Sequence, residues 1–179
     1  MSMEKSNIQF SGYRILGEIG RGAAAVVYKA EEISLNKIVA IKLLNPALFG
    51  DPASVERFIQ EARTVASLRH PGIVPVTDLD EFEGRLFMVM EFMPGGDLTS
   101  WVRDHGLLGL RLIGAIVGEV AEALDYAHSQ GIVHGDVKPA NVLLSAPLDQ
   151  PGARARLADF GVLRAVEKST ATQSAELAG

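Results

Sequence analysis

The chain has 179 residues, enough for one large domain or two small lobes, and its 47% hydrophobic and 22% charged composition excludes wholesale disorder. The formal net charge is −5 and no block of basic residues occurs, so nonspecific nucleic-acid binding is not expected. The absence of cysteine excludes disulfides and thiolate metal sites.

The first elements predict a β-sheet that carries an unusual hairpin. Two runs with β-branched and aromatic residues, 13–19 and 26–31, flank a stretch made almost entirely of glycine and alanine, 20–25. After a short turn, a third strand is expected over 37–44. These elements therefore predict strands joined by a tip that lacks bulky side chains.

A helix and two further strands complete this first part of the chain. Asp51 supplies an N-cap and Pro52 suits the first helical position, and the apolar residues that follow as far as Ala66 recur on one helical face. Two more strands are expected over 74–80 and 85–92, separated by a turn. Residues 13–93 thus predict a mainly antiparallel sheet with one helix packed on it.

The second part of the chain is predicted to be mainly helical. A Pro-Gly-Gly break at 94–96 marks the boundary, and Asp97 is the expected N-cap of a helix over 98–104. A long apolar helix follows over 110–128, and because charged residues interrupt it we predict no membrane span and a cytoplasmic location. The remaining expected elements are a polar loop at 134–141 and short strands at 142–144 and 156–158.

The glycine pair Gly20 and Gly22 is open to three interpretations. An ordinary hairpin turn is one of them, and a dinucleotide-binding motif is another. A dinucleotide site would start a helix directly after the glycines, whereas residues 26–30 predict a strand. The third is a hairpin tip whose backbone N–H groups approach phosphates closely, and this interpretation is favoured.

Lys42 ends an apolar strand, and Glu61 lies near the edge of the apolar face of the first helix. Alone, each would more often be a solvated surface charge. Together they predict an ion pair that holds the lysine extended toward anionic oxygens.

The segment from His134 to Asn141, with Asp159, supplies an acid, a cation, an amide and a second acid. Asn141 and Asp159 carry the oxygen ligands that Mg²⁺ prefers, and Asp136 can accept the proton of an attacking hydroxyl. Lys138 would neutralise charge on a phosphoryl group in transfer. A merely polar loop is the weaker alternative.

These motifs resemble the eukaryotic-like Ser/Thr protein kinase family of the kind common in bacteria, from about Tyr13 to Gly161. The resemblance implies an α+β, two-lobed fold with ATP and Mg²⁺ as cofactors and a protein Ser/Thr hydroxyl as substrate. It divides the chain into an extension (1–12), a small lobe (13–93), a partial, incomplete helical large lobe (94–165) and a truncated, flexible activation segment (166–179).

The resemblance also implies roles for individual residues. Gly20, Arg21 and Gly22 would cover the ATP phosphates, and Lys42, paired with Glu61, would contact them. Asp136 would be the base, and Asn141 and Asp159 would hold Mg²⁺. The further implied positions are Val27, Ala40 and Leu143 around adenine, the Glu91 carbonyl and Met93 N–H at its edge, Asp97 near the ribose, and a packed column of Val65, His134 and Phe160.

The sequence departs from the family pattern in three ways. Ala25 replaces a third glycine, and Gly135 stands where many of these kinases carry an arginine that clasps a phosphorylated loop. The chain also stops at Gly179, within what resembles the activation segment, where Ser169, Thr170, Thr172 and Ser174 lie in a stretch that is either a phosphosite region or plain linker. We therefore expect an exposed apolar surface on the second part of the chain, a possible partner that covers it, and weak activity.

Two alternatives stay open from the sequence. Small-molecule phosphotransferases of the aminoglycoside and choline kinase type commonly carry the His-Gly-Asp order found at 134–136, although Lys138 and the Asp-Phe-Gly run favour a protein kinase. The other alternative is a pseudokinase-like module that binds nucleotide without turnover.

Overall fold

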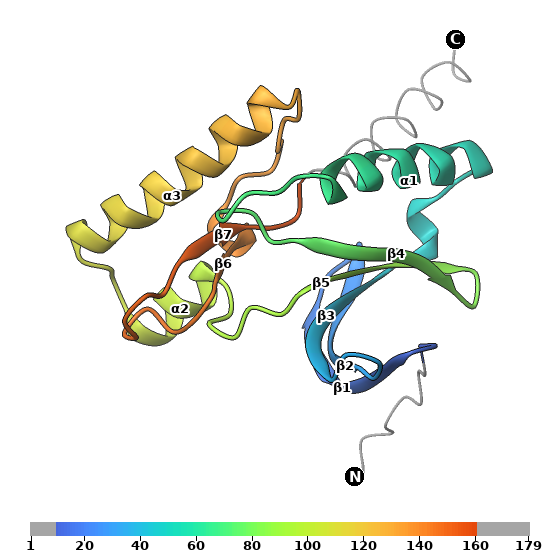
Figure 1. Ribbon diagram of the computed structural model, residues 1–179, viewed down its shortest axis with the longest axis horizontal. Coiled ribbons are helices and arrows are strands. Elements are labelled where there is room, and N and C mark those ends of the chain that lie inside the picture. The colour runs from blue at the N-terminus through green and yellow to red at the C-terminus, as the bar shows by residue number, and fades with distance from the viewer. Residues whose placement is uncertain (1–9, 161–179) are drawn as a thin grey trace.

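The computed structural model describes residues 10–160, which form two lobes joined by the segment after strand β5 (Figure 1). The small lobe contains a five-stranded antiparallel sheet in the order β1-β2-β3-β5-β4, covered on one face by helix α1. Its elements are β1 (Tyr13–Arg21), β2 (Ala25–Glu32), β3 (Lys37–Leu44), a 3₁₀ turn (Pro46–Leu48), α1 (Pro52–Ala66), β4 (Val76–Phe82) and β5 (Arg85–Glu91).

The described part of the large lobe combines two helices with a small two-stranded sheet. Helix α3 contacts strand β7, and α2 packs beside β6 and the turn before it. The elements are α2 (Leu98–His105), α3 (Leu110–Ser129), a 3₁₀ turn (Pro139–Asn141), β6 (Val142–Leu144) and β7 (Ala155–Leu157).

Helix α1 begins at the predicted signal. The Asp51 carboxylate accepts a hydrogen bond from the Ser54 N–H at 2.9 Å, and the Ser54 hydroxyl lies 3.4 Å from the Asp51 N–H, which forms a reciprocal capping box around Pro52. Ser54 is fully buried, so these hydrogen bonds satisfy polar atoms that would otherwise be costly. The cap therefore fixes the start of helix α1 at Pro52.

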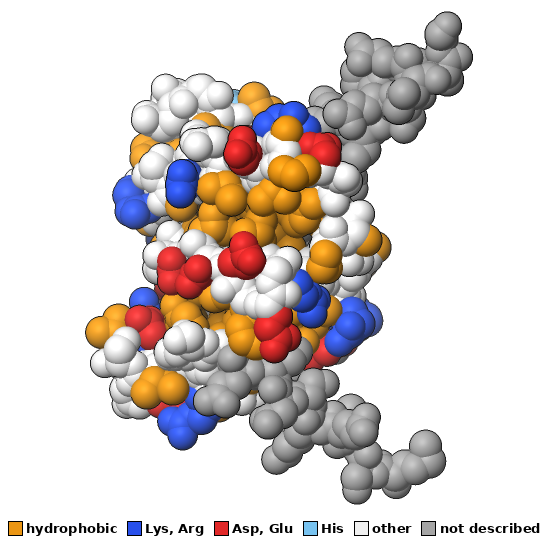
Figure 2. All heavy atoms as spheres, turned by 90° about the vertical axis from the view of Figure 1, so that its right-hand side faces the viewer, with side chains coloured by type: hydrophobic (Ala, Val, Ile, Leu, Met, Phe, Trp, Pro, Cys, Tyr) orange, Lys and Arg blue, Asp and Glu red, His pale blue; other side chains and the backbone are white. Residues whose placement is uncertain are grey.

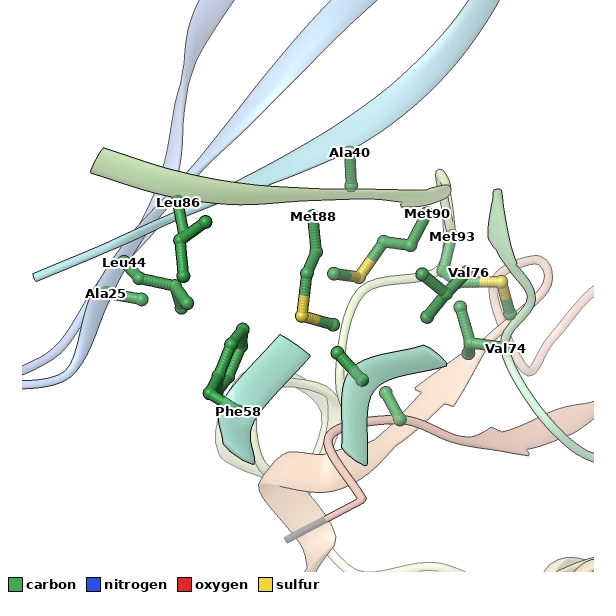
Figure 3. Packing of buried hydrophobic residues seen from close by; sticks show 12 residues of the cluster. Ala25, Ala40, Leu44, Phe58, Val74, Val76, Leu86, Met88, Met90 and Met93 are labelled. Atoms are coloured by element: carbon green, nitrogen blue, oxygen red, sulfur yellow. The ribbon is translucent and has the colours of Figure 1, made fainter. Parts of the chain in front are cut away.

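Both faces of the small-lobe sheet are packed. One face meets α1 through an apolar cluster that includes Phe58, Met88 and Met90 (Figure 3). On the opposite face, Phe10 is 1% exposed and its ring lies 4.8 Å from that of Phe87. The segment before β1, expected to be an extension, thus contributes a core side chain to the small lobe.

Charged side chains of both signs surround the apolar areas at the α1 and β4–β5 end of the small lobe. On the face shown in Figure 2, apolar side chains gather in two areas with acidic side chains between them.

Among the acids of β4, Asp78 accepts a hydrogen bond from the Tyr13 hydroxyl at 3.4 Å. Burial and the nearby carboxylates of Asp78 and Glu32 raise the pKa of Tyr13 to about 12.

The start of β4 differs from the sequence prediction. Val74 was expected in the strand, but its N–H donates to the carbonyl of Leu157 in β7 at 2.8 Å, and the Leu157 N–H donates to Gly72. Pro75 follows and has no N–H to donate to a strand ladder, so β4 starts at Val76, two residues later than predicted. Residues 72–74 therefore tie the two lobes together instead of lengthening the sheet.

Gly95 allows the chain to cross closely from one lobe to the other. Its N–H donates to the Leu144 carbonyl at 3.0 Å, and a Cβ at this position would lie 2.4 Å from the Ala146 carbonyl oxygen. The glycine is therefore needed for the close approach of the linking segment to β6.

The expected exposed apolar surface is present on α3. Leu110, Ile113 and Val117 recur along one side of the helix and are 87%, 41% and 60% exposed. Within residues 10–160 no helix is long and apolar enough to cross a membrane.

Candidate active site

A cavity of about 660 Å³ lies between the lobes. It is lined by the β1–β2 loop above, by β3 and β5 behind, and by the segment 136–141 and Asp159 below. The cavity therefore brings residues from both parts of the sequence to one place. The predicted site residues that line it are Gly20, Arg21, Gly22, Val27, Lys42, Asp97, Asp136, Lys138, Asn141 and Asp159.

Five predicted residues do not line this cavity: Ala40, Glu61, Glu91, Met93 and Leu143. Ala40 and Met93 are buried in the apolar cluster that forms the cavity's inner wall, and Leu143 packs against it. Within residues 10–160 the Met93 N–H donates no hydrogen bond, while its carbonyl accepts one from Gly96 at 3.1 Å. The Met93 N–H thus has no hydrogen-bond partner within residues 10–160.

The β1–β2 loop forms the roof of the cavity. The Gly22 N–H donates to the Ala25 carbonyl at 2.9 Å, and a β-bulge interrupts the ladder between Glu18 and Gly20. The Arg21 guanidinium is turned to Glu18, with Nε 2.8 Å from Oε1. This leaves small side chains at the tip, as the sequence predicts.

Lys42 pairs with Asp159 and not with Glu61, so the expected Lys42–Glu61 ion pair is absent. The Lys42 Nζ lies 2.6 Å from Asp159 Oδ1, and the lysine side chain is 11% exposed. Glu61 lines a separate pocket with Phe160 and residues 131–133, and it makes no ion pair within the described residues. Burial raises the pKa of the Glu61 carboxyl, and Arg57 offsets this in part. The reason for the difference is the placement of the two acids: Asp159 lines the same cavity as Lys42, whereas Glu61 lines the separate pocket.

Asp159 adopts a backbone conformation that is uncommon for residues other than glycine. Its φ is +57°, in the left-handed region, while the preceding Ala158 N–H donates to the Asn141 carbonyl at 2.9 Å. Such a residue persists only where the surrounding contacts hold it, and these positions cluster at functional sites. The hydrogen bond from Ala158 to Asn141 and the ion pair with Lys42 supply those contacts.

His134 is a buried structural residue that links the segment 134–141 to Ala158, the residue before Asp159. It is 1% exposed, its Nε2 lies 2.9 Å from the Ala158 carbonyl, and its Nδ1 accepts from the Asp136 N–H at 3.2 Å. This pattern requires a neutral ring with the proton on Nε2. Burial lowers the pKa of His134, opposed in part by the hydrogen bond to Ala158.

The His134 ring also reaches the predicted packed column. Its centroid lies 4.5 Å from that of Phe160, and Phe160 shares an apolar cluster with Val65 of α1. The three side chains are therefore brought together as expected, across both lobes.

Three polar side chains cluster on the floor of the cavity. The Lys138 Nζ lies 2.7 Å from Asp136 Oδ2, and the Asn141 Nδ2 donates to the Asp136 carbonyl at 2.8 Å and to Oδ2 at 3.2 Å. Asn141 is buried, so its amide is held in one orientation. Asp136 is thus positioned by two neighbours from its own loop.

The donor set beside Asp136 fits Mg²⁺. Because the Asn141 Nδ2 is used in hydrogen bonds, its Oδ1 is left as an oxygen donor, and Asp159 adds carboxylate oxygens at the same cavity. Within residues 10–160 no group of three His, Asp or Glu side chains could hold a metal ion alone. Magnesium commonly takes one or two protein carboxylates together with substrate phosphates, which matches this arrangement.

A further contact near the site that the sequence did not reveal joins β5 to β7. The Arg156 Nη1 on β7 donates to Glu91 Oε2 at the end of β5 at 2.9 Å. The residues are far apart in sequence and no spacing rule connects them. An acidic residue at the end of one strand and a basic residue on another become partners only once the lobes are assembled.

Comparison with known proteins identifies the family and the fold. The family model of the protein kinase domain matches residues 13–177 of this chain. The chain is 42% identical over 157 residues to serine/threonine-protein kinase PknJ of Mycobacterium tuberculosis, covering 88% of this chain and 26% of that protein. It is 38% identical over 168 residues to the probable serine/threonine-protein kinase PknB of Lactococcus lactis, covering 93% and 26%.

Solved structures agree. The crystal structure of the M. tuberculosis PknI kinase domain superposes with a TM-score of 0.74 at 38% identity, covering 88% of this chain and 62% of that one. Rad53 in complex with AMP-PNP superposes with a TM-score of 0.75 at 33% identity, covering 84% and 38%. The chain therefore belongs to the protein kinase domain family, and its two-lobed α+β fold is the kinase fold. It spans about a quarter of the length of these curated relatives.

Proposed function

We propose that the cavity binds ATP with Mg²⁺ and that the chain transfers the γ-phosphoryl group to a serine or threonine hydroxyl of a protein. The observation that carries this proposal is the convergence of Lys42, Asp136, Asn141 and Asp159 on one cavity under a loop of small residues. The relatives are named serine/threonine-protein kinases, and the related Rad53 structure holds an ATP analogue.

The chain's own residues divide the work by their chemistry. Asp136 accepts the proton of the attacking hydroxyl. The hydroxyl oxygen bonds to the γ-phosphorus while the bond between the γ-phosphorus and the ADP oxygen breaks. Lys138, 2.7 Å from Asp136, places positive charge beside the transferred group. Lys42 offers a cation to the phosphates from the cavity wall.

Asn141 and Asp159 are the residues that would hold Mg²⁺, which supplies charge neutralisation at the phosphates when it is bound. For the nucleoside, Val27 lines the cavity, and Ala40 and Leu143 belong to the same apolar wall, so these three would pack on adenine. The Met93 N–H and the Glu91 carbonyl would meet its edge. The Asp97 carboxylate already accepts hydrogen bonds from the Ser100 N–H and hydroxyl at the start of α2. It would keep these hydrogen bonds while it contacts the ribose.

A phosphoryl-transfer assay tests the proposal with the chain and its Asp136→Asn variant. Labelled ATP is incubated with Mg²⁺ and a panel of acceptors that includes a Ser/Thr protein, an aminoglycoside and choline. We expect transfer to the protein acceptor alone, and a loss of about 10²- to 10⁴-fold in the variant because a general base is removed. Affinity for AMP-PNP should stay within about threefold, because the Asp136 side chain acts on the hydroxyl.

The possible outcomes separate the alternatives. Transfer to a small alcohol would favour a small-molecule phosphotransferase. AMP-PNP binding with no transfer to any acceptor would favour a nucleotide-binding module. The protein substrate, a partner on the exposed α3 surface and the cytoplasmic location stay predictions.

A further inference from the structure

Asn45 holds the tip of the β1–β2 loop with its backbone and its side chain. Its N–H donates to the Ala24 carbonyl at 2.9 Å, and its Nδ2 donates to the Ala23 carbonyl at 3.1 Å. One residue thus engages two consecutive carbonyls of the loop. Its remaining side-chain atom, Oδ1, accepts from the Ala47 N–H at 3.1 Å, so the amide is held in one orientation.

These contacts decide which backbone groups of the loop face the cavity. In a trans peptide the C=O and the following N–H point in opposite directions, and the described chain contains no cis peptide bond. The Ala23 carbonyl points toward Asn45, so the Ala24 N–H points away from it. Ala24 lines the cavity and Asn45 does not. Within residues 10–160 the Ala24 N–H donates to no acceptor.

We infer that Asn45 is a positioning residue for phosphate recognition: it turns the Ala23 and Ala24 carbonyls away from the cavity and presents the Ala24 N–H to a phosphate oxygen. This inference rests on the proposed nucleotide site. Carbonyl oxygens that faced a phosphate would repel it, whereas a backbone N–H attracts it. Asn45 comes directly after strand β3, which also carries Lys42. The loop above the cavity and the lysine in the cavity wall are therefore positioned by the same strand.

Two variants isolate the side-chain donor. Asn45→Asp keeps the size, the oxygen that caps the Ala47 N–H and the backbone N–H, but it loses the donor to Ala23 and adds a negative charge. Asn45→Ala loses the donor and the cap but adds no charge. The lost donor is the feature that both variants share. Asn36→Asp is the matched control, since it makes the same chemical change in the exposed β2–β3 turn, where φ is +49° and aspartate is tolerated.

The experiment measures ADP affinity with Mg²⁺ and adenosine affinity for all four proteins by calorimetry. Adenosine lacks phosphates and reports on the adenine and ribose contacts alone. We expect both Asn45 variants to weaken ADP binding about three- to tenfold and to leave adenosine binding within about twofold. The Asn36→Asp control should match the wild type for both ligands.

Several results would overturn the inference. These are ADP affinity that is unchanged in Asn45→Asp, a loss restricted to one Asn45 variant, and an equal loss for ADP and adenosine. Failure of the wild type to bind ADP with Mg²⁺ would instead remove the proposed function on which the inference rests. Amide hydrogen exchange at residues 20–25 provides a test without ligand: exchange should be faster in both Asn45 variants, and unchanged exchange would contradict the inference.

Discussion

The Lys42 Nζ on strand β3 lies 2.6 Å from Asp159 Oδ1, which follows strand β7. This ion pair crosses the cavity and joins the two lobes. Removing one partner of a charge-assisted pair costs more than removing a neutral hydrogen bond, because the remaining charge loses its compensation. Each residue of the pair also has a proposed role in ligand binding: Lys42 would contact the phosphates, and Asp159 would hold Mg²⁺.

Replacing the lysine should weaken nucleotide binding without abolishing its dependence on Mg²⁺. Lys42→Met removes the cation but leaves Asn141 and Asp159 in place, so AMP-PNP affinity should fall roughly ten- to hundredfold, the value of one charge-assisted contact. Lys37→Met, at the exposed start of the same strand, is the matched control and should bind as the wild type does. Equal AMP-PNP affinities for Lys42→Met and Lys37→Met would contradict the role of Lys42.

Gly95→Ala should destabilise the fold by about 1–3 kcal/mol or more. The added Cβ would lie 2.4 Å from the Ala146 carbonyl oxygen and 2.7 Å from Leu144 Cβ, so the linking segment or strand β6 must move. The matched control is Gly118→Ala in helix α3, where a Cβ meets nothing within 4 Å and alanine should stabilise by up to about 1 kcal/mol. Urea denaturation measures both changes, and the account fails here if the two variants shift stability in the same direction.

The Glu91–Arg156 pair should couple the end of β5 to β7. A double-mutant cycle with Glu91→Gln and Arg156→Gln is expected to give a coupling of about 0.5–1 kcal/mol, because the side chains are partly screened by solvent at 36% and 23% exposure. The exposed pair Arg103 and Asp104 serves as the reference, with side chains 68% and 54% exposed, and should couple less. A coupling at Glu91 no larger than that reference would contradict a linking role.

Stability should fall as the pH drops from 7.5 to 5.5 in a way that depends on His134. Burial lowers its pKa in the folded chain, whereas in the unfolded chain it titrates near its ordinary value of about 6.5. Below that value the unfolded state binds more protons, so protonation favours unfolding. The contribution is fully present above about pH 6.5 and is lost as the pH falls toward the lowered value.

The comparison of wild type with His134→Gln isolates this contribution from the other titrating groups. Denaturation at pH 7.5 and 5.5 should show the wild type losing up to about 1.4 kcal/mol more than the variant over this interval. Glutamine can still donate to the Ala158 carbonyl but has no charge to gain. Parallel pH dependences in the two proteins would show that His134 does not titrate as proposed.

Local signals in the sequence were enough for most elements. The strand over 37–44 and the cap at Asp51 are where the patterns predict them, because β-branched runs and capping residues act over a few positions. The predicted start of β4 was wrong, because an apolar residue such as Val74 fits equally well in a strand of the small lobe and in a buried contact between the lobes. Its hydrogen-bond partner, Leu157, comes from the other lobe, and no local pattern contains that information.

The candidate site shows the same division. The motifs predicted that Asp136, Asn141 and Asp159 lie close together, and the three residues line one cavity. The partner of Lys42 was not predictable from spacing, because only the assembled lobes bring Asp159 to the cavity that Lys42 lines and leave Glu61 in a separate pocket. The contacts of Asn45 and Arg156 also depend on how loops and lobes meet in three dimensions.

The most direct test of the account is a calorimetric titration of the chain with AMP-PNP, with and without Mg²⁺, in the wild type and in Asp159→Asn. Asp149→Asn, in the exposed turn between β6 and β7, is the matched control. We predict Mg²⁺-enhanced binding in the wild type and the control, and the loss of that enhancement in Asp159→Asn. Binding that is absent in the wild type, or equally Mg²⁺-dependent in all three proteins, would contradict a nucleotide and metal site in this cavity.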